Sequence, residues 1–126
     1  FTVANNSWTT IPFNSSTRTD GITWDATNSR YVVVKEGRYA ITTGAEFANG
    51  ATGRRGLRIS VNGAAIGRTF VPGNSAVAPD VLLTKYVYLI AGDTVSVEAY
   101  QNSGGDLNVT GTTERETFCD ISFEGL

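Results

Sequence analysis

The stretch "YLIAGDTVSVEAY", from Tyr88 to Tyr100, places two apolar segments on either side of Ala-Gly-Asp. Apolar residues alternate through the second half, which is the period of a β-strand. Gly92 and Asp93 are turn formers, and the Asp93 carboxylate can accept hydrogen bonds from backbone N–H groups of a tight turn. The stretch therefore predicts two successive strands joined by a short connection.

The composition favours strands and turns over helices. Charged residues make up 17% of the 126 residues, and 14 residues are glycine, whereas helices favour Ala, Leu, Glu, Lys and Gln. This length suits one hydrophobic core and is short for two ordinary domains. We therefore predict a single all-β domain over residues 1–126.

The charges are dispersed along the chain. Ten basic and twelve acidic residues give a net charge of -2, with no cluster of the kind that binds phosphate backbones. No apolar run approaches the roughly 18 residues that a membrane-spanning helix needs. We expect neither a nucleic-acid partner nor insertion into a membrane.

Short β-branched and aromatic runs recur between turn-forming residues. Asn62-Gly63 is the clearest hairpin signal, because Asn-Gly supplies both positive-φ positions of a type I′ turn. Turns are also predicted at Asn49-Gly50, Pro72-Gly73 and Asn102–Asp106. The predicted strands are Thr2–Ala4, Thr9–Phe13, Ile22–Asp25, Arg30–Val34, Gly37–Ala48, Arg55–Asn62, Ala65–Val71, Val81–Ile90, Asp93–Gln101 and Thr117–Phe123. Many short strands with frequent turns are typical of a sandwich or a barrel.

Little in the sequence supports catalysis. The chain has no histidine, the commonest general base and transition-metal ligand. Cys119 is the single cysteine, so no intrachain disulfide can form, and its place in a predicted strand favours a buried, inert thiol over a nucleophile. The acidic residues are spread over separate turns and form no glycosidase-like pair. We expect the protein not to be an enzyme.

An aromatic skeleton runs through the first third of the chain, where Phe13, Trp24 and Tyr31 precede "GRYAI" at residues 37–41. This string resembles the signature of the C1q domain, the globular head of the C1q and tumour-necrosis-factor-like superfamily. The departures from the family pattern are Thr19 in place of Asn or Asp, Tyr31 in place of Phe, and Ile41 and Thr43 in place of aromatic residues.

Two later blocks extend the resemblance. "YLIAGDTVSV" at residues 88–97 is similar to the family's Leu-x-x-Gly-Asp-x-Val-x-Val, and "TFCDISFEGL" at residues 117–126 is similar to its closing strand. The three blocks lie in the family order and cover nearly the whole chain. The resemblance implies a ten-stranded jelly-roll β-sandwich that associates as a tight homotrimer, often at the tip of a collagen-like or fibrous stalk.

The strand predicted at Val81–Ile90 is apolar on both faces. An apolar sheet face is normally covered, so with the resemblance in view a neighbouring subunit covers one of them. We assign to the subunit interface Ala40, Thr42, Leu82, Tyr86, Tyr88, Ile121 and Phe123. We assign to the core Trp24, Tyr31, Tyr39, Ile41, Val87, Leu89 and Phe118. The alternative is that the tyrosines sit at a sandwich rim with their hydroxyls in water.

The stretch "NGATGRRGLR", residues 49–58, combines a glycine-rich loop with Arg54, Arg55 and Arg58. Arginine offers a planar fork of donors that could grip an anionic sugar or a carboxylate. The alternative, which is the more common role, is that these charges flank a strand and keep a sheet edge soluble.

Calcium is the one metal that the resemblance brings in, because some family members bind it near the apex of the trimer. Calcium prefers loop carboxylates and carbonyls as ligands, and Asp80 and Asp106 are the loop acids that could supply them. The more common role of such acids is that of solvated turn residues. No other cofactor is expected.

Two functions from different classes fit these observations. The first is the non-enzymatic trimeric head of a fibre on a virion, above all a bacteriophage, or on a microbial surface, which binds a host receptor or glycan. The second is a secreted C1q-like or cytokine-like ligand for protein receptors. The lack of a disulfide and the Thr-, Ser-, Asn- and Gly-rich composition favour the first. We expect an extracellular domain that forms the C-terminal head of a longer protein, behind an upstream stalk or virion protein.

Overall fold

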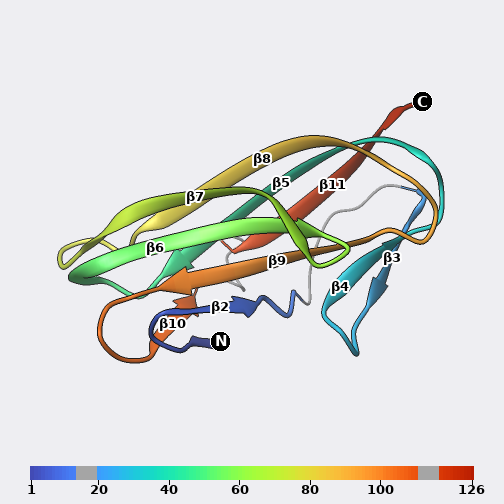
Figure 1. The fold of residues 1–126 in the computed structure, drawn as a ribbon. Coiled ribbons are helices and arrows are strands. Elements are labelled where there is room, and N and C mark those ends of the chain that lie inside the picture. Colours follow the sequence, from blue (N-terminus) through green and yellow to red (C-terminus); the bar gives the residue numbers. More distant parts are fainter. Residues whose placement is uncertain (14–19, 111–116) are drawn as a thin grey trace.

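The computed structural model describes residues 1–13, 20–110 and 117–126, and the regular elements in these ranges are all β-strands (Figure 1). The strands are β1 (Thr2–Val3), β2 (Ser7–Thr10), β3 (Ile22–Asp25), β4 (Arg30–Val33), β5 (Gly37–Phe47), β6 (Gly50–Val61), β7 (Ala64–Asn74), β8 (Asp80–Leu89), β9 (Thr94–Gln101), β10 (Leu107–Thr110) and β11 (Phe118–Gly125). The all-β prediction is confirmed, and Thr19 lies outside the described residues. None of the described segments forms a helix with the length and apolarity to cross a bilayer.

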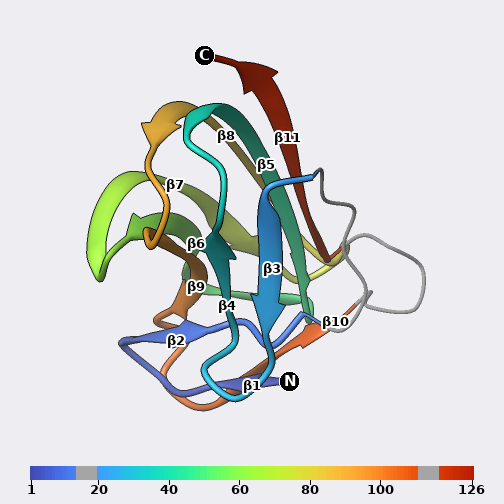
Figure 2. The ribbon, with the colours of Figure 1, turned by 90° about the vertical axis from the view of Figure 1, so that its right-hand side faces the viewer.

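The strands form two antiparallel sheets that lie one over the other (Figures 1 and 2). In the first, which we call the β5 sheet, β8 pairs with one edge of β5 while β10 and then β11 follow the other edge, and β1 pairs with β10. In the second, the β9 sheet, the order is β3-β4-β9-β6-β7, and β2 also pairs with β9. The sequence analysis missed β10, a strand of four residues.

The stretch from Tyr88 to Tyr100 passes from one sheet to the other, since β8 belongs to the β5 sheet and β9 to the β9 sheet. The connection is tight: Gly92 has a φ of 95°, and the Asp93 carboxylate accepts a hydrogen bond from the Ile90 N–H at 2.9 Å. The Asn62 side-chain amide donates to the same carboxylate at 2.9 Å. These hydrogen bonds lower the pKa of Asp93, so the turn is tied to the neighbouring hairpin by an ionised side chain.

The hairpin between β6 and β7 is the one that Asn62-Gly63 predicts. Asn62 and Gly63 have φ values of 51° and 82°, as a type I′ turn requires. Asn49 and residues 102–106 also lie between strands. The turn predicted at Pro72-Gly73 is wrong, because both residues lie within β7. β7 is an edge strand of its sheet, a position in which proline leaves no ladder hydrogen bond unmade.

The core lies between the two sheets. Tyr31, Tyr39, Ile41 and Leu89 are buried in it, as predicted. Trp24 and Val87 pack against the core and are partly buried. The buried members of β5 alternate along the strand, so every second side chain is left for the outer face of the β5 sheet.

The assignment of rows along β11 is wrong. Ile121 lies directly opposite Ile41, and Phe123 lies opposite Tyr39, with the two rings 5.4 Å apart. Because directly opposed residues point to the same face of a sheet, Ile121 and Phe123 share the core face and are not part of an outer interface. Phe118 lies over Gly44 on the outer face and is not a core residue.

Candidate functional site

The outer face of the β5 sheet carries an exposed apolar row on β8. Leu82, Tyr86 and Tyr88 are 65%, 76% and 50% exposed, whereas their neighbours Val81 and Leu89 are buried. Ile90 continues the row beyond the end of the strand and is also exposed. Solvent-exposed faces of antiparallel sheets normally carry polar residues, so this row is a candidate contact surface.

The adjacent row on β5 consists of small side chains. Ala40, Thr42 and Gly44 lie opposite Tyr86, Thr84 and Leu82 respectively. A Cβ atom at Gly44 would come within 2.8 Å of Leu82 and 2.6 Å of Phe118, so the glycine lets these two larger side chains close over the strand. The outer face of the β5 sheet therefore has a row of small side chains on β5 next to a row of larger, exposed side chains on β8. We call these two rows the β5–β8 face.

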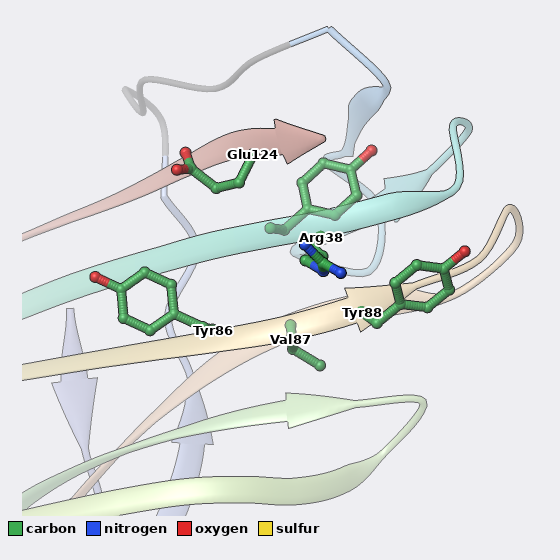
Figure 3. Close-up of a pocket in the computed structure, with 6 residues that line it drawn as sticks. Arg38, Tyr86, Val87, Tyr88 and Glu124 are labelled. Carbon is green, nitrogen blue, oxygen red and sulfur yellow. The ribbon is translucent and has the colours of Figure 1, made fainter. Parts of the chain in front are cut away.

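One end of the β5–β8 face contains an open pocket of about 300 Å³ (Figure 3). Arg38 lies between Tyr86 and Tyr88 in this view, and Glu124 projects from β11 on the far side of Arg38 from β8. The Tyr88 hydroxyl donates a hydrogen bond to the Glu36 carboxylate, which raises the pKa of Tyr88. The pocket therefore offers charged and phenolic groups at the margin of an apolar surface.

The arginines of residues 49–58 lie in strand β6 and not in a loop. Arg55 points into the protein and is fully buried. Its Nη1 donates to the Thr52 carbonyl at 2.7 Å and its Nη2 to the Gly50 carbonyl at 3.0 Å, and burial lowers the pKa of the guanidinium. Arg55 therefore fixes the start of β6 from inside, and its assignment to a ligand loop is wrong.

Arg54 and Arg58 point outward from the β9 sheet, because side chains alternate along β6. The Arg58 Nε donates to the Glu98 Oε1 at 2.7 Å, and Glu98 also accepts hydrogen bonds from Ser60 at 2.6 Å and Ser96 at 2.7 Å. The Arg58 guanidinium is therefore paired with the buried carboxylate of Glu98. Arg54 forms no salt bridge with a carboxylate among the described residues and stays available to a ligand.

Sequence reasoning missed four residues that surround these arginines: Trp8, Arg68, Phe70 and Tyr100. The aromatic rings pack on one another and against the arginines. They come from β2, β7 and β9, so no short motif contains them. A local signal for part of this group was present in the sequence: Arg68 and Phe70 are two positions apart in the predicted strand Ala65–Val71, so their side chains lie on the same face of the sheet.

Metal and thiol chemistry receive no geometric support within the described ranges. No group of three or more His, Cys, Asp or Glu side chains in them could hold a metal ion, so calcium at Asp80 and Asp106 stays a prediction. Cys119 is buried, and burial raises the pKa of its thiol to about 12. The thiol is therefore protonated and shielded at neutral pH.

Comparison with solved structures finds similar chains of murine APRIL. The crystal structure at pH 5.0 has a TM-score of 0.58 over 74% of this chain and 72% of that chain, at 17% identity. The structures at pH 8.5 and pH 8.0 have TM-scores of 0.55 and 0.56 over 74% of this chain and 70% and 68% of those chains, at 16% identity. APRIL is a jelly-roll protein of the tumour-necrosis-factor family.

This chain has a tumour-necrosis-factor-like jelly-roll fold. The resemblance drawn from the sequence is thereby confirmed at the level of fold. A scan against protein-family models and a search of the curated proteins gave no match. In the jelly roll, the β5–β8 face and the arginine-bearing face lie on different sheets, so the chain has two separate candidate surfaces.

Proposed function

We propose that this jelly roll forms a homotrimer through the β5–β8 face and serves as a non-enzymatic binding head. The observation that carries the proposal is the row formed by Leu82, Tyr86 and Tyr88, which is apolar or aromatic and at least half exposed in the single chain. A large exposed apolar row on a sheet marks a surface that another molecule covers. The resemblance to the C1q and tumour-necrosis-factor-like superfamily implies that two further copies of the chain cover it.

The small side chains beside the row support this arrangement. Ala40 and Thr42 leave room for rings of a second copy to approach the sheet, while Phe118 and Leu82 close over Gly44 and border that space. Tyrosine suits such a place because its ring is covered while its hydroxyl keeps a polar partner. For Tyr88 that partner is Glu36.

A trimeric head gains its affinity from multivalency. Three identical binding surfaces hold weak contacts at high effective concentration, so modest affinities add up to useful avidity. We place this head on a fibre of a virion, such as that of a bacteriophage, or of a microbial surface, where it binds a host receptor or glycan. The support is compositional: the chain is rich in Gly, Thr, Ser and Asn and has a single cysteine.

The alternative is a secreted ligand for protein receptors. At 17% identity, the similarity to murine APRIL speaks for the fold alone and favours neither function. The two functions differ in the chemistry of the target. A protease removes protein receptors from cells and leaves the glycans of lipids and polysaccharide, so a head that binds such a glycan would still bind treated cells, whereas a ligand for protein receptors would not.

The proposed assembly is tested by the mass of the native species. Sedimentation velocity or native mass spectrometry should give three times the protomer mass of 13.4 kDa down to micromolar concentration. A stable monomer at these concentrations would overturn the homotrimer, and a dimer would require a different use of the β5–β8 face. Binding of the assembled protein to cells before and after protease treatment then separates the two functions.

A further inference from the structure

The outer face of the β9 sheet carries three aromatic rings in one row. Phe70 on β7 lies opposite Gly56 on β6, Gly56 lies opposite Tyr100 on β9, and Tyr100 lies opposite Trp8 on β2. The ring centroids are 5.0 Å apart for Trp8 and Tyr100 and 5.8 Å apart for Phe70 and each of the other two. The four strands thus build one continuous aromatic surface, which we call the aromatic platform.

Gly56 is the residue that makes the platform continuous. A Cβ atom at this position would come within 2.6 Å of the Phe70 ring, so the ring lies across the backbone of β6 where any other residue would displace it. Phe70 can then reach Tyr100 across the intervening strand at 5.8 Å with an interplanar angle of 85°. Tyr100 is held in place by its hydroxyl, which donates to the Asn6 side chain at 2.6 Å.

Three guanidinium groups lie over the platform. Arg54 and Arg68 are 3.9 Å and 5.6 Å from the Phe70 centroid, and Arg58 is 4.5 Å from the Trp8 ring. Arg58 is neutralised by Glu98. Neither Arg54 nor Arg68 has a carboxylate within salt-bridge distance in the described part of the chain, and both are exposed. Within the residues that the structure describes, these two guanidinium groups therefore lie over Phe70 without a carboxylate partner.

We propose that the aromatic platform binds a saccharide that carries carboxylates. The apolar C–H face of a sugar ring can pack on the partly exposed Tyr100 ring by dispersion and burial of apolar surface, next to Trp8, one face of which the Arg58 guanidinium covers at 4.5 Å. A carboxylate on the same or the next sugar is the planar partner that the guanidinium fork of Arg54 or Arg68 binds through two hydrogen bonds. Stacking on Phe70 orients these forks in advance, which reduces the side-chain entropy lost on binding.

Other anionic polymers fit the platform less well. Binding to a nucleic-acid backbone draws on many phosphate contacts and on a positive field, whereas this chain has a net charge of -2 and only Arg54 and Arg68 uncommitted on the platform.

The inference rests on the proposed function in one respect, namely that a trimer would present three platforms. Figure 2 shows β5, β8 and β11 on one side of the molecule and β2, β6 and β9 on the other, so assembly through the β5–β8 face leaves the platforms uncovered.

The test uses the whole protein and two series of oligosaccharides. Oligogalacturonates and sialylated oligosaccharides are titrated by isothermal calorimetry, each against a counterpart of the same length whose carboxyl groups are methyl-esterified. We expect the carboxylated series to bind and the esterified series to bind at least about tenfold more weakly, because each charge-assisted hydrogen bond that is lost costs roughly that factor. Equal affinity for both series would overturn the role of the arginines.

Variants locate the binding site. Arg54→Gln combined with Arg68→Gln should weaken binding to the carboxylated series by about tenfold or more, whereas Arg30→Gln, a partly exposed arginine on β4 that is paired with Asp25, should leave it unchanged. Unchanged binding by the double variant, no binding by the parent protein to either series, or preferential binding of oligothymidylate would each overturn the proposal. The mass of the parent protein, measured in the same samples, shows separately whether the homotrimer has failed.

Discussion

At the scale of single residues, Cys119 shows how burial decides chemistry. Its thiol lies in the core with no exposed surface, and its pKa is raised from 9.0 to about 12, chiefly because burial disfavours the thiolate. The thiolate is the reactive form of cysteine. We therefore expect no alkylation of the native protein by iodoacetamide at about pH 8.5, and complete alkylation in denaturing guanidinium.

The same shift gives stability a pH dependence. A thiol whose pKa is higher in the folded state than in the unfolded state contributes its full stability below pH 9 and loses it as the pH rises from 9 towards about 12. Cys119→Ala should remove this part of the alkaline slope of the free energy of unfolding, measured by urea titration at several pH values. Rapid alkylation of the native parent, or identical slopes for parent and variant, would show that the thiol is exposed.

At the scale of elements, β11 shows that the alternation of residues along a strand does not by itself decide which row faces the core. The pattern Phe118, Asp120, Ser122 against Cys119, Ile121, Phe123 defines two rows, and each row holds an aromatic residue. What decides the face is the register with β5, in which Ile121 lies opposite Ile41. That register depends on a strand far away in the sequence, so the row that faces the core could not be read from β11 alone.

Pairwise substitutions on β11 test this register. Ile121→Ala should lower the free energy of unfolding by about 2 to 4 kcal/mol, because it removes a side chain that is 2% exposed and leaves a cavity. Asp120→Ala, on the exposed row next to it, should change it by less than about 0.5 kcal/mol. Urea denaturation monitored by tryptophan fluorescence measures both. If Asp120→Ala were the more destabilising substitution, the two rows would have to be exchanged.

Other elements were predictable to the extent that their signals were local. Asn62-Gly63 fixed the hairpin between β6 and β7 because both residues tolerate the required positive φ. The burial of Tyr39 and Ile41 followed from alternation in a long strand. The aromatic platform could not be predicted, because Trp8, Phe70 and Tyr100 come together only when β2, β9, β6 and β7 lie side by side in the sheet. Arg55 was misassigned for a related reason, since a charged residue is rarely fully buried.

At the scale of the whole molecule, the two sheets present different chemistry to their surroundings. The β5–β8 face is apolar and has little charge along β8, while the aromatic platform carries the exposed Arg54 and Arg68. A sandwich with one face for assembly and the other for ligands can bring several ligand surfaces together without rearranging either sheet. This division of roles makes assembly and ligand binding separable by mutation.

The separation is tested most directly on the assembly face. Tyr86→Asp should convert the proposed homotrimer into monomers, because it would bring three carboxylates together where water is excluded, and unpaired buried charges are costly. Val77→Asp is the matched control: Val77 is 64% exposed and Tyr86 is 76% exposed, but Val77 lies between β7 and β8, outside the β5–β8 face. Sedimentation velocity should give monomers for the first variant and the parent mass for the second, with the same far-ultraviolet circular dichroism for all three proteins. A Tyr86→Asp protein that assembles like its parent would place the subunit contact on another surface, and equal dissociation of both variants would show that added charge alone disrupts the assembly.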